Sequence, residues 1–158
     1  MSGLKPGYLG RYFSFNELTR TNHRKYLEEN RREALLYRDV GMKLAAMLDV
    51  IREHYGKPVI VHSGFRCVGL NAAIGGSSTS QHKKFEAADF HVAGEDLREV
   101  WEWIWKESGI EFGQLILEGW RDGNPSWIHL SLGEPYRPAH KCGQVMTWSR
   151  DRGYQRVG

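Results

Sequence analysis

Hydrophobic residues recur every three or four positions in the first third of the chain, which predicts helices there. In residues 34–54 this apolar stripe consists of Leu36, Val40, Leu44, Met47, Leu48 and Ile51. The spacing places these side chains on one face of a helix. Gly56-Lys57-Pro58 predicts the end of that helix. The charged stretch at residues 22–30 contains few helix breakers and is expected to be helical as well.

From residue 57 onward, the pattern changes to short β-branched or alternating segments. The predicted strands are residues 59–62, 88–92, 114–118 and 127–132. Residues 95–106 have the pattern of an amphipathic helix. A loop rich in Gly and Ser follows the first strand and contains one helical turn at residues 70–74, and residues 119–126 predict a hairpin connection. We therefore expect an α+β fold with a small antiparallel sheet and helices packed on its apolar face.

Three of the predicted strands place side chains that could bind a metal or act as a base on the face opposite their apolar residues. Asp89 and His91 share one face of the second strand, and His129 and Ser131 share one face of the last. Glu118 lies on the corresponding face of the predicted strand 114–118, which comes between these two strands in the sequence. If these strands share a sheet, one side of that sheet is core and the other side carries a site.

The composition is that of an ordinary globular domain. The chain has 158 residues, of which 41% are hydrophobic and 26% charged, with a net charge of +3. This length favours a single domain, residues 1–158. No apolar run is long enough for a membrane span, and the first 15 residues lack the apolar core of a secretory signal. Cys67 and Cys142 exclude a disulfide framework and a cysteine-zinc cluster.

Within this domain we distinguish a mainly helical part, residues 1–56, a core with the candidate site, residues 57–132, and a basic C-terminal segment, residues 133–158. The last segment contains five basic and two acidic residues. We expect it to be a solvated tail. The alternative is that it attracts an anionic polymer.

His82 belongs with the polar strand residues, although it precedes Asp89 by seven positions. In one helix, seven residues would separate them by about 10.5 Å along the axis. Ligands at about 2.0–2.2 Å from one zinc ion cannot be that far apart. Either the two residues are unrelated or the chain turns back between them. The Gly- and Ser-rich residues 75–80 favour the turn.

Four sequence elements, in this order, resemble the zinc D-Ala-D-Ala metallopeptidases. That family includes dipeptidases, carboxypeptidases and phage L-alanyl-D-glutamate endolysins, and it shares its fold with hedgehog signalling domains. The elements are Ser63-Gly64-Phe65-Arg66, Ser80-Gln81-His82 with Asp89 seven residues later, Glu118, and Trp127-Ile128-His129. The resemblance covers roughly residues 13–131. Many members carry glycine where this chain has Phe85, which puts the loop geometry or the pocket rim in doubt, but not the ligands.

The resemblance implies a zinc ion whose ligands are His82, Asp89 and His129. It also implies that Glu118 is the general base and that Arg66 and Ser80 contact the substrate. Two neutral imidazoles and one carboxylate leave a zinc site with net charge near +1 and an open position, which lowers the pKa of a bound water. A nearby carboxylate can then accept the proton of that water, and an arginine can pair with a substrate carboxylate or an oxyanion.

Each of these roles has a structural alternative. His91 shares a face with Asp89 and is either a fourth ligand, which would close the site, or an outer or surface residue. Glu118 alone would be an ordinary strand-end carboxylate, and Arg66 alone a loop cap. Cys67 beside Arg66 raises the idea of a thiol nucleophile, but no His/Asn partner supports it.

The implied function is zinc-dependent hydrolysis of a peptide bond in the peptidoglycan stem peptide, next to a D-amino acid, by a carboxypeptidase or an endopeptidase. One rival is a zinc-bearing module that binds cell-wall peptide without cutting it; loss of the base would mark it, and Glu118 is present. A nucleic-acid enzyme would need a basic surface, which a charge of +3 does not favour. We expect a monomer without a nucleic-acid partner, made in the cytoplasm and then released by lysis or carried on a phage particle.

Overall fold

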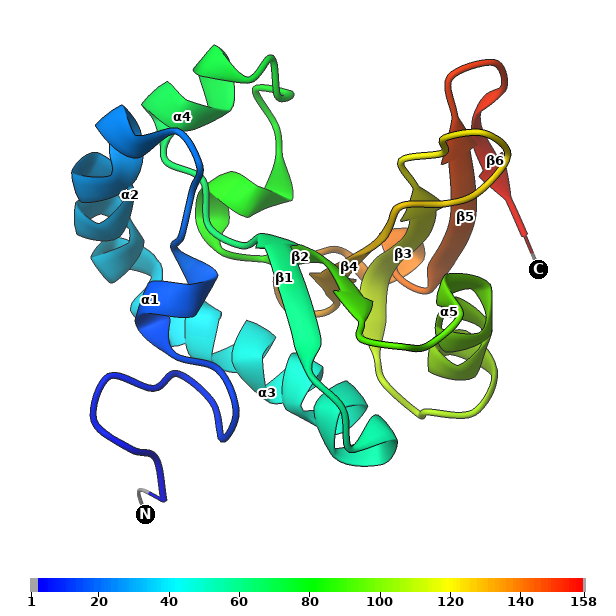
Figure 1. The fold of residues 1–158 in the computed structure, drawn as a ribbon, viewed down its shortest axis with the longest axis horizontal. Coiled ribbons are helices and arrows are strands. Elements are labelled where there is room, and N and C mark those ends of the chain that lie inside the picture. The colour runs from blue at the N-terminus through cyan, green and yellow to red at the C-terminus, as the bar shows by residue number, and fades with distance from the viewer. Residues whose placement is uncertain (1–2, 158) are drawn as a thin grey trace.

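The structure, a computed structural model, describes residues 3–157, which form a six-stranded sheet and the helices around it (Figure 1). The α-helices are α1 (Phe15–Leu18), α2 (Leu27–Ala34), α3 (Arg38–Tyr55), α4 (Val68–Ala73) and α5 (Leu97–Lys106). The 3-10 turns are η1 (Arg24–Tyr26), η2 (Leu35–Tyr37), η3 (Gln81–Lys84) and η4 (Ala139–Lys141). The strands are β1 (Val59–Ser63), β2 (Ala87–Val92), β3 (Phe112–Glu118), β4 (Trp127–Leu132), β5 (Gln144–Ser149) and β6 (Gly153–Arg156). The predicted α+β class is confirmed.

The strands follow the order β1-β2-β4-β3-β5-β6. Neighbours are antiparallel except β3 and β5, which are parallel. The predicted antiparallel arrangement therefore holds for every neighbouring pair but this one. The expectation of a solvated C-terminal tail is wrong, because β5 and β6 continue the sheet beyond β3. Val145 and Met146 of β5 are buried. Their burial, rather than the charge of the segment, decides its structure.

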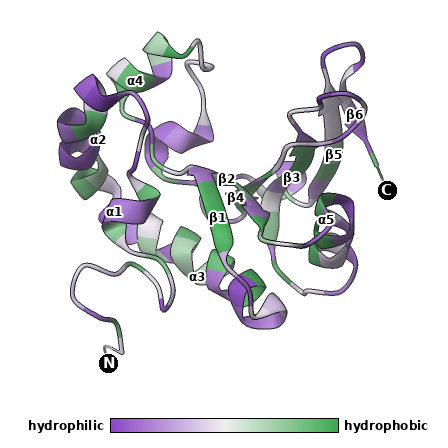
Figure 2. Ribbon diagram, viewed as in Figure 1, coloured by the Kyte–Doolittle hydropathy of each residue, from purple (hydrophilic) through white to green (hydrophobic). Residues whose placement is uncertain are grey.

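Helices α3 and α5 cover the apolar face of the sheet. Helix α3 contacts β1, β2 and β4, and α5 contacts β2, β3 and β4. Leu44, Leu48 and Ile51 of the predicted stripe are fully buried, whereas Leu36 lies in η2, before α3, and is 81% exposed. Figure 2 shows the contrast between the hydrophobic strand β1 and the mainly hydrophilic helix α2 at the periphery. Gly56 ends α3 with a left-handed backbone (φ 62°), as its position predicts.

Phe85, the residue that departs from the family's glycine, has a left-handed backbone with φ 65°. This region favours glycine, because a Cβ there approaches the following carbonyl oxygen. The Phe85 ring is fully buried and packs 5.3 Å from the ring of Phe65, measured between centroids. A Cβ on Gly41 of α3 would lie 2.7 Å from the Phe85 ring. Glycine at position 41 therefore makes room for phenylalanine at position 85.

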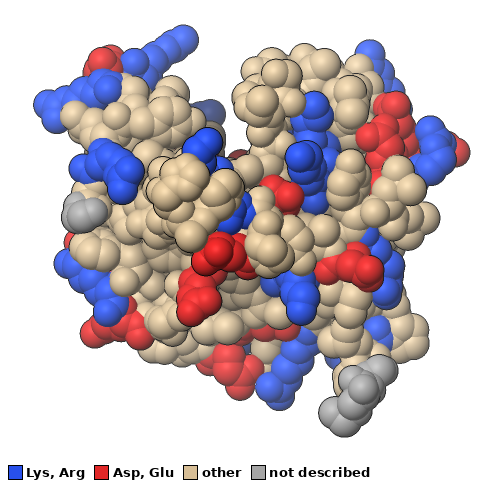
Figure 3. Space-filling view, turned by 180° about the vertical axis from the view of Figure 1, so that it is seen from behind, with Lys and Arg blue, Asp and Glu red and all other residues tan. Residues whose placement is uncertain are grey.

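Charged side chains of both signs are interspersed over the face of the molecule shown in Figure 3. Such mixing produces no extended field of one sign on that face. Among residues 3–157, no helix combines the length and the hydrophobicity that crossing a membrane requires.

Candidate active site

The register between β2 and β4 brings together two of the predicted ligands. Asp89 and His129 are directly paired across these antiparallel strands. Their side chains lie on the face of the sheet opposite α3 and α5, as the alternation predicts. The Asp89 Oδ1 atom lies 2.9 Å from His129 Nδ1.

The third predicted ligand, His82, arrives from the turn η3. The Ser80 hydroxyl oxygen caps this turn by accepting a hydrogen bond from the His82 amide (3.3 Å). The chain turns back after η3, so that His82 Nε2 lies 3.3 Å from Asp89 Oδ1. The alternative that His82 and Asp89 are unrelated is therefore wrong.

The three donor atoms fit one zinc ion. They lie within 4.8 Å of one another. Two ligands bound to one tetrahedral zinc ion at about 2.0–2.1 Å are separated by roughly 3.4 Å. The His82–Asp89 separation already has this value, and the His129–Asp89 separation requires a side-chain shift of about half an ångström.

Both imidazoles have their second nitrogen held by an oxygen atom. His82 Nδ1 lies 2.7 Å from the Gly64 carbonyl oxygen, and His129 Nε2 lies 2.9 Å from Gln81 Oε1. An imidazole that donates its other N–H to a fixed oxygen is oriented for metal binding. Gln81 Nε2 in turn donates to the Ser131 hydroxyl (3.1 Å). Sequence reasoning missed Gln81, although it lies between Ser80 and His82 in the motif.

The pKa shifts of this group follow from burial and mutual contact. Burial lowers the pKa of His82, which favours its neutral form, the form that can ligate a metal. Burial alone would raise the pKa of Asp89, but the two imidazoles outweigh it and lower that pKa well below its usual range. Asp89 is therefore an anion at neutral pH. Burial alone would also lower the pKa of His129, but its hydrogen bond to Asp89 raises it.

Glu118 ends β3 beside the three donors and is not one of them. Its Oε1 accepts a hydrogen bond from the Trp127 indole N–H (2.9 Å), and the two residues are cross-strand partners. Burial raises the pKa of Glu118 above its ordinary value. A carboxylate that is held in place and has a raised pKa suits proton transfer near neutral pH. Trp127 is part of the sequence motif, but sequence reasoning gave it no role.

Arg66 lies at the edge of the same site. Its guanidinium donates to the Ser80 hydroxyl (3.2 Å), and its buried Nε has no hydrogen-bond partner among the described residues. Burial lowers the pKa of Arg66, which nevertheless stays charged at any physiological pH. Asn30 of α2 fixes this segment, because it donates to the Phe65 carbonyl (3.1 Å) and accepts from the Cys67 amide (2.7 Å). The backbone around Arg66 is thus tied to the helical layer.

All six predicted site residues line one pocket of about 490 Å3, which we call the central pocket. These residues are Arg66, Ser80, His82, Asp89, Glu118 and His129. Arg137 and Tyr154 also line it and come from the C-terminal segment. Sequence reasoning missed both, because that segment was expected to be a tail.

Two other residues raised by the sequence lie outside this pocket. His91 shares a face of β2 with Asp89 but does not line the pocket; its Nδ1 lies 2.7 Å from Nε2 of His62, so it is not brought together with the donors as a fourth ligand. Cys67 is buried, accepts a hydrogen bond from the Leu70 amide and contacts Glu29. Burial raises the pKa of its thiol, which opposes a role as a nucleophile.

The site combines a donor set of two imidazoles and one carboxylate with a second, buried carboxylate. This combination is typical of metal-dependent hydrolases. The sequence model of the family described as Peptidase M15 matches residues 11–131. The chain therefore belongs to the M15 peptidases, which are zinc enzymes, and the resemblance found in the sequence is confirmed. No curated protein is similar enough to add a second comparison.

Proposed function

We propose that this protein hydrolyses a peptide bond in the peptidoglycan stem peptide, with zinc bound by His82, Asp89 and His129. The observation that carries the proposal is the convergence of these donors with Glu118 and Arg66 in the central pocket. Membership of the M15 family supports a zinc peptidase. The stem peptide as substrate rests on the resemblance of the motifs to enzymes that act on D-Ala-D-Ala and L-alanyl-D-glutamate bonds.

When bound, zinc would polarise the scissile carbonyl and lower the pKa of a water molecule. Glu118 would accept the proton of that water and then donate it to the leaving amine. The Trp127 N–H keeps the Glu118 carboxylate oriented during both transfers. Gln81 and Gly64 hold the outer nitrogens of the two imidazoles, so that both rings keep their orientation.

Arg66 would position the substrate. Its guanidinium is held by Ser80 and lines the pocket, and the planar fork of an arginine can make a two-point contact with a carboxylate. In a carboxypeptidase, the partner is the terminal carboxylate of the peptide. In an endopeptidase, it is a side-chain carboxylate or the developing oxyanion. Ser80 contributes through Arg66 and through the cap of η3.

The rival function is a zinc-bearing module that holds stem peptide without cutting it. Such a module transfers no proton, so it does not require a buried carboxylate next to the metal donors. The raised pKa and fixed orientation of Glu118 favour the enzyme.

The test compares Glu118→Gln with the wild type in zinc content, stem-peptide binding and cleavage. Glutamine keeps the shape of the side chain but cannot accept a proton, so turnover should fall by about a hundred- to ten-thousandfold. Zinc content and peptide binding should stay unchanged, since Glu118 is not assigned as a ligand. Glu102→Gln on the exposed face of α5 is the matched control and should retain full activity.

Three outcomes would contradict the proposal. Full activity of Glu118→Gln would remove this residue from the mechanism, and loss of zinc together with activity would make it a ligand. A wild type that holds zinc and binds stem peptide but cleaves none of its bonds would identify a binding module. Mass spectrometry of muropeptides after digestion identifies the bond that is cut and separates carboxypeptidase from endopeptidase.

A further inference from the structure

A second hollow of about 520 Å3 adjoins the central pocket, and we call it the side groove. It runs along β1, the edge strand of the sheet, and is bounded by the segment after α1 and by the C-terminal end of α4. Arg66 lines both the side groove and the central pocket. The two hollows therefore meet at Arg66, and a peptide whose scissile bond lies in the central pocket would pass this side chain to reach the side groove.

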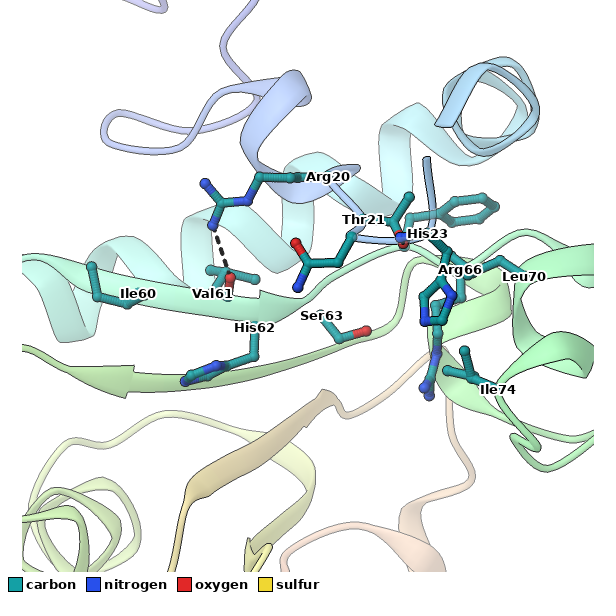
Figure 4. A pocket seen from close by; sticks show the side chains of 12 residues that line it. Arg20, Thr21, His23, Ile60, Val61, His62, Ser63, Arg66, Leu70 and Ile74 are labelled. Carbon is teal, nitrogen blue, oxygen red and sulfur yellow. Dashed lines mark hydrogen bonds between the residues drawn. The ribbon is translucent and has the colours of Figure 1, made fainter. Parts of the chain in front are cut away.

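The side groove has a positive lining. Its cationic residues are Arg20 and Arg66, and no Asp or Glu among the described residues lines it. The Arg20 guanidinium donates to the Val61 carbonyl oxygen (3.2 Å) and forms no ion pair within residues 3–157. Figure 4 shows Arg20 held against β1 by this bond, with Arg66 at the other end of the groove. The lining thus suits an anionic group.

Apolar side chains complete the lining. Ile60 and Ile74 are 37% and 40% exposed, although large aliphatic side chains are usually buried. Both line the side groove, together with Leu70. Exposed aliphatic side chains beside unpaired cations fit an occupant that carries small apolar side chains and a carboxylate. The volume lies within the range of small-ligand pockets, about 300–1,000 Å3.

We propose that the side groove binds the part of the substrate peptide next to the scissile bond, and that Arg20 holds a free carboxylate on that part. Ile60 and Ile74 contact apolar side chains of the same segment, such as alanine methyl groups. Arg20 is thereby a specificity-determining residue that selects acidic over amidated peptides. This proposal rests on the proposed function, since it takes a stem peptide as the substrate.

The test measures binding of two stem pentapeptides by isothermal titration calorimetry. One carries a free α-carboxylate on its γ-linked glutamate, and the other is amidated at that carboxylate. The titrations use the zinc-loaded Glu118→Gln chain, so that turnover does not disturb the heat signal. Arg20 is exposed, so its pairing with a carboxylate is partly screened by solvent, and the acidic peptide should bind about fivefold more tightly.

Adding Arg20→Gln to this chain should reduce that preference to less than about twofold, because the amide lacks the positive charge. Arg20→Lys should retain part of the preference. Arg38→Gln, at the exposed start of α3, is the matched control and should retain all of it. Thermal unfolding of each variant shows whether loss of the Val61 contact alters the fold; Arg20→Lys keeps the charge if Arg20→Gln does not fold.

An unchanged preference in folded Arg20→Gln would overturn the proposal, as would equal affinity of both peptides for the parent chain. Failure of both peptides to bind would overturn it as well. The proposed function is judged separately, by cleavage of the two peptides with the wild-type enzyme. Efficient cleavage without any preference for the acidic peptide would leave the peptidase in place and remove the side groove from its specificity.

Discussion

Replacing Phe85 should reverse the usual order of stability between alanine and glycine. The ring is fully buried, and truncating a buried phenylalanine costs about 3–5 kcal/mol. The backbone at this position has φ 65°, a conformation that costs a residue with a Cβ roughly 1–2 kcal/mol. Glycine escapes this cost, whereas alanine does not. Phe85→Gly should therefore be about 1 kcal/mol more stable than Phe85→Ala, and about 2–4 kcal/mol less stable than the wild type.

The matched control is Phe90 of β2, which is equally buried but lies in an extended strand. There, glycine should be less stable than alanine by about 0.5–1 kcal/mol, the ordinary order in a strand interior. The assay is urea unfolding followed by tryptophan fluorescence, with excess chelator present so that metal binding does not contribute to the free energy of unfolding.

A difference of 1 kcal/mol corresponds to roughly 2–4 °C in Tm for a domain of this size, so thermal unfolding provides a second measurement. If Phe85→Gly is less stable than Phe85→Ala, as at Phe90, the backbone at position 85 is not strained. The glycine found at this position in many members of the family would then need another explanation than backbone geometry.

Two further predictions concern residues that hold the site in place. Gln81→Leu removes the oxygen that orients His129 Nε2, so zinc affinity should fall about ten- to a hundredfold; competition with a chromogenic chelator measures it, and unchanged affinity would contradict the role. Trp127→Phe removes the hydrogen bond that stabilises ionised Glu118, so the pKa of Glu118 should rise further. Because the base acts when ionised, the acidic limb of the kcat/KM profile should move to higher pH, by about one unit for a lost interaction of roughly 1.4 kcal/mol; a shift to lower pH would contradict this assignment.

Local patterns in the sequence predicted the elements around the site because alternation and turn chemistry are local properties. The polar faces of β2, β3 and β4 follow from the order of residues along each strand, and so does the turn that carries His82. The roles of His82, Asp89, His129 and Glu118 stay predictions until the variants are measured.

The parts that sequence reasoning missed depend on distant segments. The parallel pairing of β5 with β3 is not encoded in either strand alone. The burial of Val145 and Met146 was not predicted, because the C-terminal segment was interpreted from its charge. Arg20 shows no local signal either, because its partner Val61 lies 41 residues along the chain. Gln81 lies inside the motif Ser80-Gln81-His82, but its contact with His129 forms only when β4 is in place.

The two C-terminal strands affect how readily copies of the molecule aggregate. The family match ends at residue 131, and a chain shortened there would leave one side of β3 without hydrogen-bond partners. An open strand of that kind is a template on which other chains can assemble into aggregates. Among the described residues β5 covers that side, and this end of the sheet is formed by β6, which has four residues and carries the cation of Arg156. A short, charged last strand is a poor template, so residues 133–157 protect this end of the sheet from edge-to-edge association.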